Sequence, residues 1–251
     1  MEISYTMLHS LMTCPYSYYL RYVKKVKLQE SSASVYGTAV HRTIKIGYDS
    51  KLSRDEWAKV FKREWMNLTS SKIVVMNGDG DYLKKFKKGQ EQVMDYYDKF
   101  VKDNPPPKYT ELFFGRKQGV TLGNHIIIGV FDLIDFDDKI VDFKTGVKPT
   151  QSELDLDLQF TIYSYAYRQL YGKEESGITL RHLGTMKDLV TTRTNDDFVL
   201  LLDEVNKIDT IMTTMKDNPI YTRNLDRGCA NCYFLEECLG RERKIGRFFS
   251  K

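Results

Sequence analysis

Two short stretches decide the fold: Gly129-Val-Phe-Asp132-Leu-Ile-Asp135 and Val141-Asp142-Phe143-Lys144-Thr145-Gly146. Their apolar residues are mostly β-branched or aromatic, which is typical of strands, and the Asp137-Asp138 pair between them predicts a tight turn. Asp132 and Asp142 should then lie roughly opposite each other on neighbouring antiparallel strands. Asp142 and Lys144 are two positions apart, so they share one face of their strand. The sequence therefore predicts that two carboxylates and one amine converge.

This trio suits metal-assisted hydrolysis. Hard divalent cations prefer carboxylate oxygens, and phosphodiester hydrolysis uses such a cation to polarise the phosphate and to supply hydroxide. A neighbouring lysine can orient the attacking water and stabilise developing negative charge. An isolated Asp-x-Lys is also common as a surface ion pair, so the trio alone leaves that interpretation open.

Helical periodicity dominates the sequence before Pro105, and strands follow it. The predicted helices span residues 4–23 (with a bend near Pro15), 35–48, 54–67, 81–102, 154–171 and 196–215. The predicted strands span 109–116, 125–135, 139–143, 176–183 and 189–193. This order predicts an α/β fold with a central mixed sheet flanked by helices and a helical N-terminal part. We expect one domain over 1–251, divided into 1–108 (mostly helical), 109–195 (the core) and 196–251 (a helix and a cysteine motif).

Composition sets wide limits on the class of protein. Of the 251 residues, 41% are hydrophobic, enough for a core, and the net charge of +4 permits a nucleic-acid partner without requiring one. The longest uncharged run, residues 3–20, is too polar to span a bilayer, and no signal peptide is evident. We therefore expect no membrane partner and a cytoplasmic protein, in a cell or in the host of a virus, with reduced cysteines.

All four cysteines belong to one arrangement. Cys229, Cys232 and Cys238 have the spacing C-x₂-C-x₅-C, and Cys14 lies near the other end of the chain. Four thiolates suit either a structural Zn²⁺ or a [4Fe–4S] cluster, and zinc is the metal more commonly bound by a lone C-x-x-C. The spacing by itself leaves both metals open.

The carboxylate–lysine pattern resembles the PD-(D/E)XK nucleases and, more narrowly, their RecB-like branch. Two further motifs fit that branch: Gly37-Thr-Ala-Val-His41 resembles its Gly-x-x-x-His helix, and Gln159-Phe-Thr-Ile-Tyr163 resembles its Gln-x-x-x-Tyr helix. The resemblance implies a restriction-endonuclease-like core in which Mg²⁺ or Mn²⁺ is held by the set His41, Asp132, Asp142 and the Phe143 backbone carbonyl. It implies catalytic roles for Asp132, Asp142, Lys144, Gln159 and Tyr163. A histidine ligand favours Mn²⁺.

The cysteines extend the resemblance to the iron–sulfur members of that branch. The opening Ser4-x-Thr6 and Cys14-Pro15-x-x-Tyr18 and the closing cysteine triplet resemble those of the CRISPR-associated Cas-four and AddB-type nucleases. This implies a [4Fe–4S] cluster, held by Cys14, Cys229, Cys232 and Cys238, that joins the two chain ends. No Gly-x-x-x-x-Gly-Lys-Ser/Thr motif is present, which favours a stand-alone nuclease over a helicase.

The resulting hypothesis is a metal-dependent DNA exonuclease that hydrolyses phosphodiester bonds at DNA ends, with single-stranded DNA preferred. It would act in recombination and repair, replication or CRISPR adaptation, with proteins of those processes as partners. The alternatives are a DNA-end-binding or assembly subunit that works mainly through partners, and a zinc-stabilised nucleic-acid-binding module. Two basic clusters could follow a phosphate backbone or form solvated faces: Lys84, Lys85, Lys87 and Lys88, and Arg241, Arg243, Lys244 and Arg247.

Overall fold

The structure is a computed structural model that describes residues 1–27, 30–71, 74–76, 78, 80–217, 221–226, 229 and 232–240. The chain divides into two compact units. The first comprises Met1–Glu2 and Gln29–Asp203, and the second comprises Ile3–Leu28 and Glu204–Lys251. The units group the first helical segment with the C-terminal one, a division that differs from the three segments expected from the sequence. The basic cluster Arg241, Arg243, Lys244 and Arg247 lies outside the described residues.

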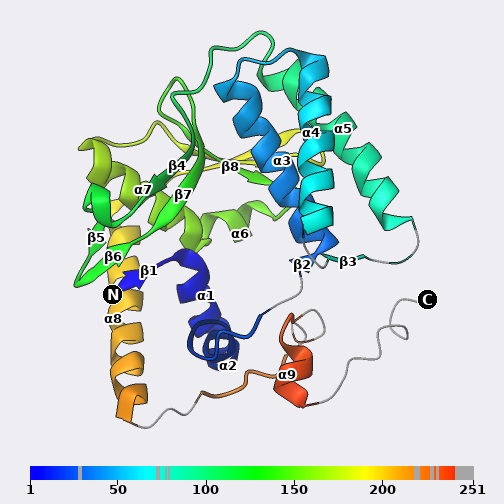
Figure 1. Cartoon of the computed structure of the whole chain (residues 1–251). Coiled ribbons are helices and arrows are strands. Elements are labelled where there is room, and N and C mark those ends of the chain that lie inside the picture. The colour runs from blue at the N-terminus through cyan, green and yellow to red at the C-terminus, as the bar shows by residue number, and fades with distance from the viewer. Residues whose placement is uncertain are drawn as a thin grey trace. The chain divides into compact units, whose positions relative to one another are not determined.

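A five-stranded mixed sheet forms the centre of the first unit, with the order β10-β9-β8-β7-β4. The strands are β4 (Tyr109–Phe114), β7 (Gly129–Ile134), β8 (Ile140–Lys144), β9 (Ile178–His182) and β10 (Lys187–Thr191). β8 and β9 are parallel, and the other neighbours are antiparallel. β4, β7 and β8 thus form an antiparallel meander, and the predicted mixed sheet with flanking helices is confirmed (Figure 1).

The expected strand 125–135 is two strands in different sheets. β6 (His125–Ile127) pairs with β5 (Thr121–Leu122) and lies beside β1 (Glu2–Ile3), whereas β7 belongs to the central sheet. The chain changes sheet at Ile128, a β-branched residue whose type gives no sign of a break. The predicted two-residue turn is longer too, because the Asp135 carboxylate accepts the amides of Asp137 and Lys139 at 2.9 and 2.8 Å.

Three long helices form one apolar layer against the sheet. They are α3 (Ser32–Asp49), α4 (Arg54–Ser71) and α5 (Asp81–Phe100), and they stand together in Figure 1. The aromatic and aliphatic residues of this layer form one buried cluster with Leu133, Val141 and Phe143 of β7 and β8. A capping interaction precedes α4, because the Ser53 amide donates to the Glu56 carboxylate at 2.8 Å. The short strands β2 (Glu30–Ser31) and β3 (Val74–Val75) pair in parallel.

The expected helix 154–171 is broken in two. α6 (Gln151–Asp155) begins with a capping box of Thr150 and Glu153, and α7 (Leu158–Tyr171) begins with Asp157, whose side chain accepts from the Gln159 amide. Competition by an Asx cap explains the break, because the Asp157 side chain satisfies the amide that an unbroken helix would pair with a carbonyl. Gly172 is the C-cap of α7, with φ of 63°. A 3₁₀ turn, η2 (Arg116–Gln118), follows β4.

The N-terminal helix of the second unit is segmented. It consists of α1 (Tyr5–Thr13), α2 (Pro15–Tyr18) and the π-helical η1 (Tyr19–Val23), and the break falls at the extended residue Cys14. α8 (Asn195–Asp217) crosses the division between the units, and α9 (Leu235–Leu239) follows Cys232. Among the helices that the structure describes, none combines the length and apolar character needed to span a membrane.

Candidate functional site

Asp132 and Asp142 lie where the backbone pairing of β7 and β8 stops. The last paired positions are Leu133 and Val141, so one further step along each strand places Asp132 opposite Asp142. There the Asp132 carboxylate replaces a backbone acceptor, because its Oδ2 receives the Phe143 amide at 2.8 Å. The sequence-based expectation that the two carboxylates face each other across a hairpin agrees with this register.

Lys144, Gln159 and Tyr163 form a chain of contacts that leads from the Asp142 carboxylate to α7. The Lys144 amine lies 2.9 Å from Asp142 Oδ2 and donates to Gln159 Oε1 at 3.0 Å. Gln159 Nε2 in turn donates to the Tyr163 hydroxyl at 2.9 Å. Gln159 and Tyr163 are four residues apart and so share one face of α7. The structure thus brings these three predicted residues together with Asp142.

His41 joins the group from α3. Its Nδ1 lies 3.4 Å from Asp132 Oδ1, and the two side chains keep 25% and 16% of their surface exposed, so the pair is accessible from solvent. The imidazole also packs edge-on against the Phe143 ring, with the ring centroids 5.6 Å apart. The Phe143 side chain belongs to the helical core, and its carbonyl as a metal ligand stays a prediction.

The two carboxylates titrate differently because their surroundings differ. Burial, together with the charge of Asp132, raises the pKa of Asp142 to about 6. Burial also opposes ionisation of Asp132, but the His41 imidazole, the Phe143 amide and the Lys144 amine together lower its pKa. The pKa of Lys144 is raised, since the carboxylates outweigh the effect of burial on the amine. Lys144 is therefore an ammonium ion at neutral pH, and it acts by charge and by hydrogen-bond donation.

The donor set fits a hard divalent cation. Asp142 Oδ2 is buried, and within the described residues no hydrogen bond of acceptable geometry reaches it, although the Lys144 amine is close. A buried carboxylate oxygen with unused lone pairs has a missing partner, and a cation between Asp142 and Asp132 would supply one. In the described part of the chain, no three His, Cys, Asp or Glu side chains already stand in a metal-binding arrangement. The two carboxylates, with His41 beside them, would have to close around the ion.

Glu111 of β4 is a further acidic neighbour of the carboxylate site. The β4–β7 register pairs Thr110 with Leu133 and Leu112 with Phe131, which leaves Glu111 opposite Asp132. Its φ is 44°, in the left-handed region that costs free energy for a residue other than glycine. A strained backbone beside a carboxylate site would have marked this position, but sequence does not reveal φ.

The four cysteines gather within the second unit. Cys14 separates α1 from α2, and the chain near it is tied to the C-terminal segment by two hydrogen bonds: Tyr16 N to Thr222 O at 3.1 Å and Asn224 Nδ2 to Thr13 O at 2.9 Å. All four cysteines line one small cavity of about 30 Å³, which Leu20 and Phe234 close on the apolar side. All four are free thiols of intermediate burial.

The thiols influence one another. Burial raises the pKa of Cys232, and the neighbouring Cys14, Cys229 and Cys238 raise it further. Four thiolates so close together would repel each other in the absence of a cation. Within the described residues the four thiols do not already stand in a metal-binding arrangement, so a metal centre bound through sulfur stays a prediction.

The fold and the carboxylate site define a class of protein: a mixed-sheet core whose two facing carboxylates lie where two central strands diverge from their pairing. A family model of the PD-(D/E)XK nuclease superfamily matches residues 2–239, and the chain belongs to this superfamily. The membership implies a metal-dependent nuclease that acts on DNA. A search of curated proteins found no relative that matches the chain.

Proposed function

We propose that the protein is a metal-dependent DNA exonuclease of the RecB-like branch, which digests DNA from its ends and prefers single strands. The observation that carries the proposal is the convergence of Asp132, Asp142 and Lys144, with a buried Asp142 oxygen that lacks a directed partner. The end preference and the branch rest on the resemblance of the His41, Gln159–Tyr163 and cysteine motifs.

The residues divide the work of phosphodiester hydrolysis. Asp132, Asp142 and His41 would hold Mn²⁺ or Mg²⁺, which supplies Lewis acidity and lowers the pKa of a bound water. Lys144 places a fixed positive charge beside this position and stabilises negative charge that develops on the phosphate. Gln159 receives one N–H of Lys144 and so orients the amine, and Tyr163 holds the Gln159 amide.

A nuclease assay tests the activity. Wild-type protein with Mn²⁺ should shorten end-labelled linear single strands faster than double strands, and a circular single strand should survive. Asp142→Ala should cleave none of them. If the circular strand is cut as fast as the linear strand, the protein is an endonuclease and the exonuclease proposal is wrong. A pure wild-type protein that binds DNA ends without cleaving them would favour the alternative of a DNA-end-binding or assembly subunit.

We also propose that Cys14, Cys229, Cys232 and Cys238 hold a [4Fe–4S] cluster. The four thiols that line one cavity support a metal centre at this place. The resemblance to the iron–sulfur nucleases favours iron over zinc. The cluster would be structural, because hydrolysis requires no electron transfer. Protein purified without oxygen should contain iron and acid-labile sulfide in equal amounts, about four of each per chain; zinc without iron would refute the cluster and leave the zinc alternative.

A further inference from the structure

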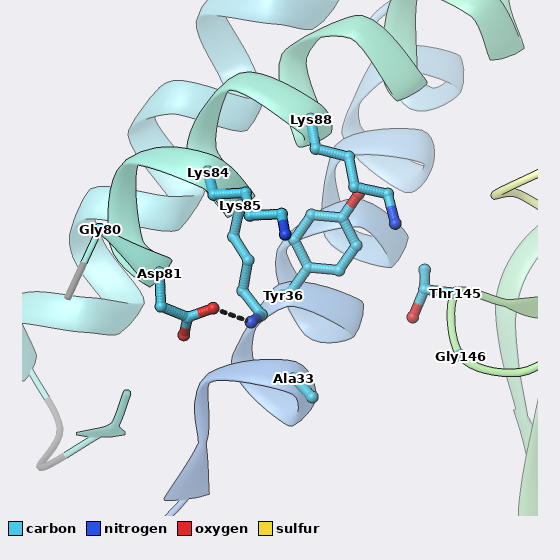
Figure 2. Close-up of a pocket in the computed structure, with 9 residues that line it drawn as sticks. All are labelled: Ala33, Tyr36, Gly80, Asp81, Lys84, Lys85, Lys88, Thr145 and Gly146. Atoms are coloured by element: carbon cyan, nitrogen blue, oxygen red, sulfur yellow. Dashed lines mark hydrogen bonds and ion pairs between the residues drawn. The ribbon is translucent and has the colours of Figure 1, made fainter. Parts of the chain in front are cut away.

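A second cavity in the first unit lies beyond the carboxylate site. Its volume is about 530 Å³, which is within the usual range for ligand pockets. The first turns of α3 and α5 and the loop after β8 line it, and Figure 2 shows the lysines of α5 on one side and Thr145 on the other. Its lining residues are not among those proposed to hydrolyse the phosphodiester bond.

The cavity carries positive charge that the protein does not neutralise. Lys85 forms an ion pair with Asp81, which cancels one of the three lining lysines. Lys84 and Lys88 are exposed, and within the described residues no carboxylate pairs with either of them. They are four positions apart on one helix face, where like charges destabilise the helix. An anion bound between them would remove that repulsion.

The opposite wall is polar and held in place. The Lys88 amine lies 5.8 Å from the centre of the Tyr36 ring, and the Tyr36 hydroxyl donates to Gln92 Oε1 at 2.6 Å. Across the cavity, the loop after Lys144 is fixed by His182 Nε2, which donates to the Gly146 carbonyl at 2.9 Å. The Thr145 hydroxyl thus faces the cavity on an anchored loop, as a donor for an oxyanion.

The cavity is close to the reacting groups. Thr145 directly follows Lys144, and a Cβ built on Gly37 of α3 would lie 3.3 Å from Thr145 Oγ1. His41 is one helical turn beyond Gly37, about 6 Å along the axis. The cavity therefore adjoins the segments that carry His41 and Lys144.

We propose that this cavity binds a phosphate group of the nucleic-acid strand close to the bond that is cut. Lys84 and Lys88 supply the charge, and Thr145 supplies a hydroxyl donor. The inference rests on the proposed nuclease function and adds a substrate subsite to it. The phosphate is either an internal diester or the terminal monoester of a DNA end, and the two sources share this chemistry.

The salt dependence of DNA binding tests the subsite without metal or cleavage. Affinity for a fluorescent single strand is measured by anisotropy in EDTA over a series of salt concentrations. Replacing Lys84 or Lys88 by Gln should reduce the magnitude of the negative slope of log K against log[salt] by about 0.7 each, and the double variant by about 1.4. Lys84→Arg/Lys88→Arg should keep the slope. Lys87→Gln is the matched control: Lys87 is exposed on the same helix but does not line the cavity.

Two results would overturn the subsite: a double Gln variant with the wild-type slope, or an equal loss for Lys87→Gln. Strands with a 5′-phosphate, a 3′-phosphate or no terminal phosphate identify the source. A terminal phosphate that tightens binding to wild type but not to the double variant assigns the cavity to DNA ends; equal binding of all strands and of a circle assigns it to the internal backbone. Because the readout needs no cleavage, an inactive wild type with a lysine-dependent slope would refute the nuclease proposal alone.

Discussion

Gln159 lies between an amine that can only donate and a phenol, and this decides which way its amide points. Lys144 requires the oxygen, so the nitrogen faces Tyr163. The Gln-x-x-x-Tyr spacing predicted a shared helix face. It could not predict that Gln159 would contact Lys144, because that contact depends on how α7 packs against β8.

Replacing Gln159 by Leu should leave Mn²⁺ affinity and KM for DNA close to wild type and lower kcat about 10- to 100-fold, because Lys144 loses the acceptor that orients it. Single-turnover cleavage and metal titration measure the two effects. Gln169→Leu is the control, since Gln169 lies on the same helix but bonds to Thr121 and Tyr165. An equal loss in both variants would reduce the role of Gln159 to helix stability.

The raised pKa of Asp142 predicts a pH-dependent cost of folding. Its pKa is about 6 in the folded protein and about 4 in an unfolded chain, so the native state binds the proton more tightly. The stability contributed by protonated Asp142 is lost as the pH rises from about 4 to about 6. Above pH 6, ionisation of Asp142 lowers the free energy of unfolding by about 3 kcal/mol.

Metal-free Asp142→Asn should therefore unfold at higher denaturant concentration than wild type at pH 8, and at nearly the same concentration below pH 4. Urea unfolding in EDTA across this range measures the difference. Asp95→Asn, at an exposed position of α5, should follow the wild-type profile. A constant difference between Asp142→Asn and wild type at every pH would contradict burial as the cause.

At the scale of elements, periodicity and turn residues predicted most helices and strands. This prediction failed where side chains compete with the backbone for hydrogen bonds. Asp157 divides the helix predicted over 154–171, Cys14 divides the helix predicted over 4–23, and the strand predicted over 125–135 changes sheet at Ile128. Such breaks depend on hydrogen bonds and partners that a local pattern does not contain.

The close packing of α4 against α3 and α5 could not be predicted from the sequence either. A Cβ on Gly89 of α5 would lie 1.9 Å from Phe61 Cζ, and one on Gly47 of α3 would lie 2.2 Å from Trp57 Cε2. In an exposed helix, alanine is more favourable than glycine by about 1 kcal/mol. At these positions, a helical pattern gives no hint that glycine is required.

Gly89→Ala should thus destabilise the protein by about 1–3 kcal/mol, because the aromatic ring of Phe61 must leave its place in a packed core. Chemical unfolding measures the change. Phe61→Leu provides the matched background: in it, Gly89→Ala should cost clearly less, since the clashing ring atoms are gone. The same cost in both backgrounds would show that α5 moves away from α4 instead.

For the whole molecule, the proposed cluster would connect cysteines far apart in the chain. Cys14 and Cys229 are 215 residues apart, and a crosslink closing so long a loop stabilises by about 5 kcal/mol in the chain-entropy model. The resemblance to the iron–sulfur nucleases implied that the four would meet. The spacing by itself could not choose between zinc and iron, since both metals bind thiolate and the choice depends on the size of the centre.

Cys232→Ser should lose bound iron and sulfide and unfold at a lower temperature, while Asp142→Ala should lose cleavage and keep its iron. Elemental analysis and thermal melts of both variants, purified without oxygen, distinguish the role of the cysteine centre from that of the carboxylate site. A Cys232→Ser protein with wild-type iron and melting temperature would show that the thiol is not a ligand.

The central claim is that Asp142 binds the metal and Lys144 stabilises charge beside it. Mn²⁺ titration and single-turnover cleavage, performed together on Lys144→Ala and Asp142→Ala, test it most directly. Lys144→Ala should bind Mn²⁺ as wild type does and cleave about 10²–10³-fold more slowly, whereas Asp142→Ala should lose both. Near-normal cleavage by Lys144→Ala, or near-normal Mn²⁺ affinity in Asp142→Ala, would contradict the account.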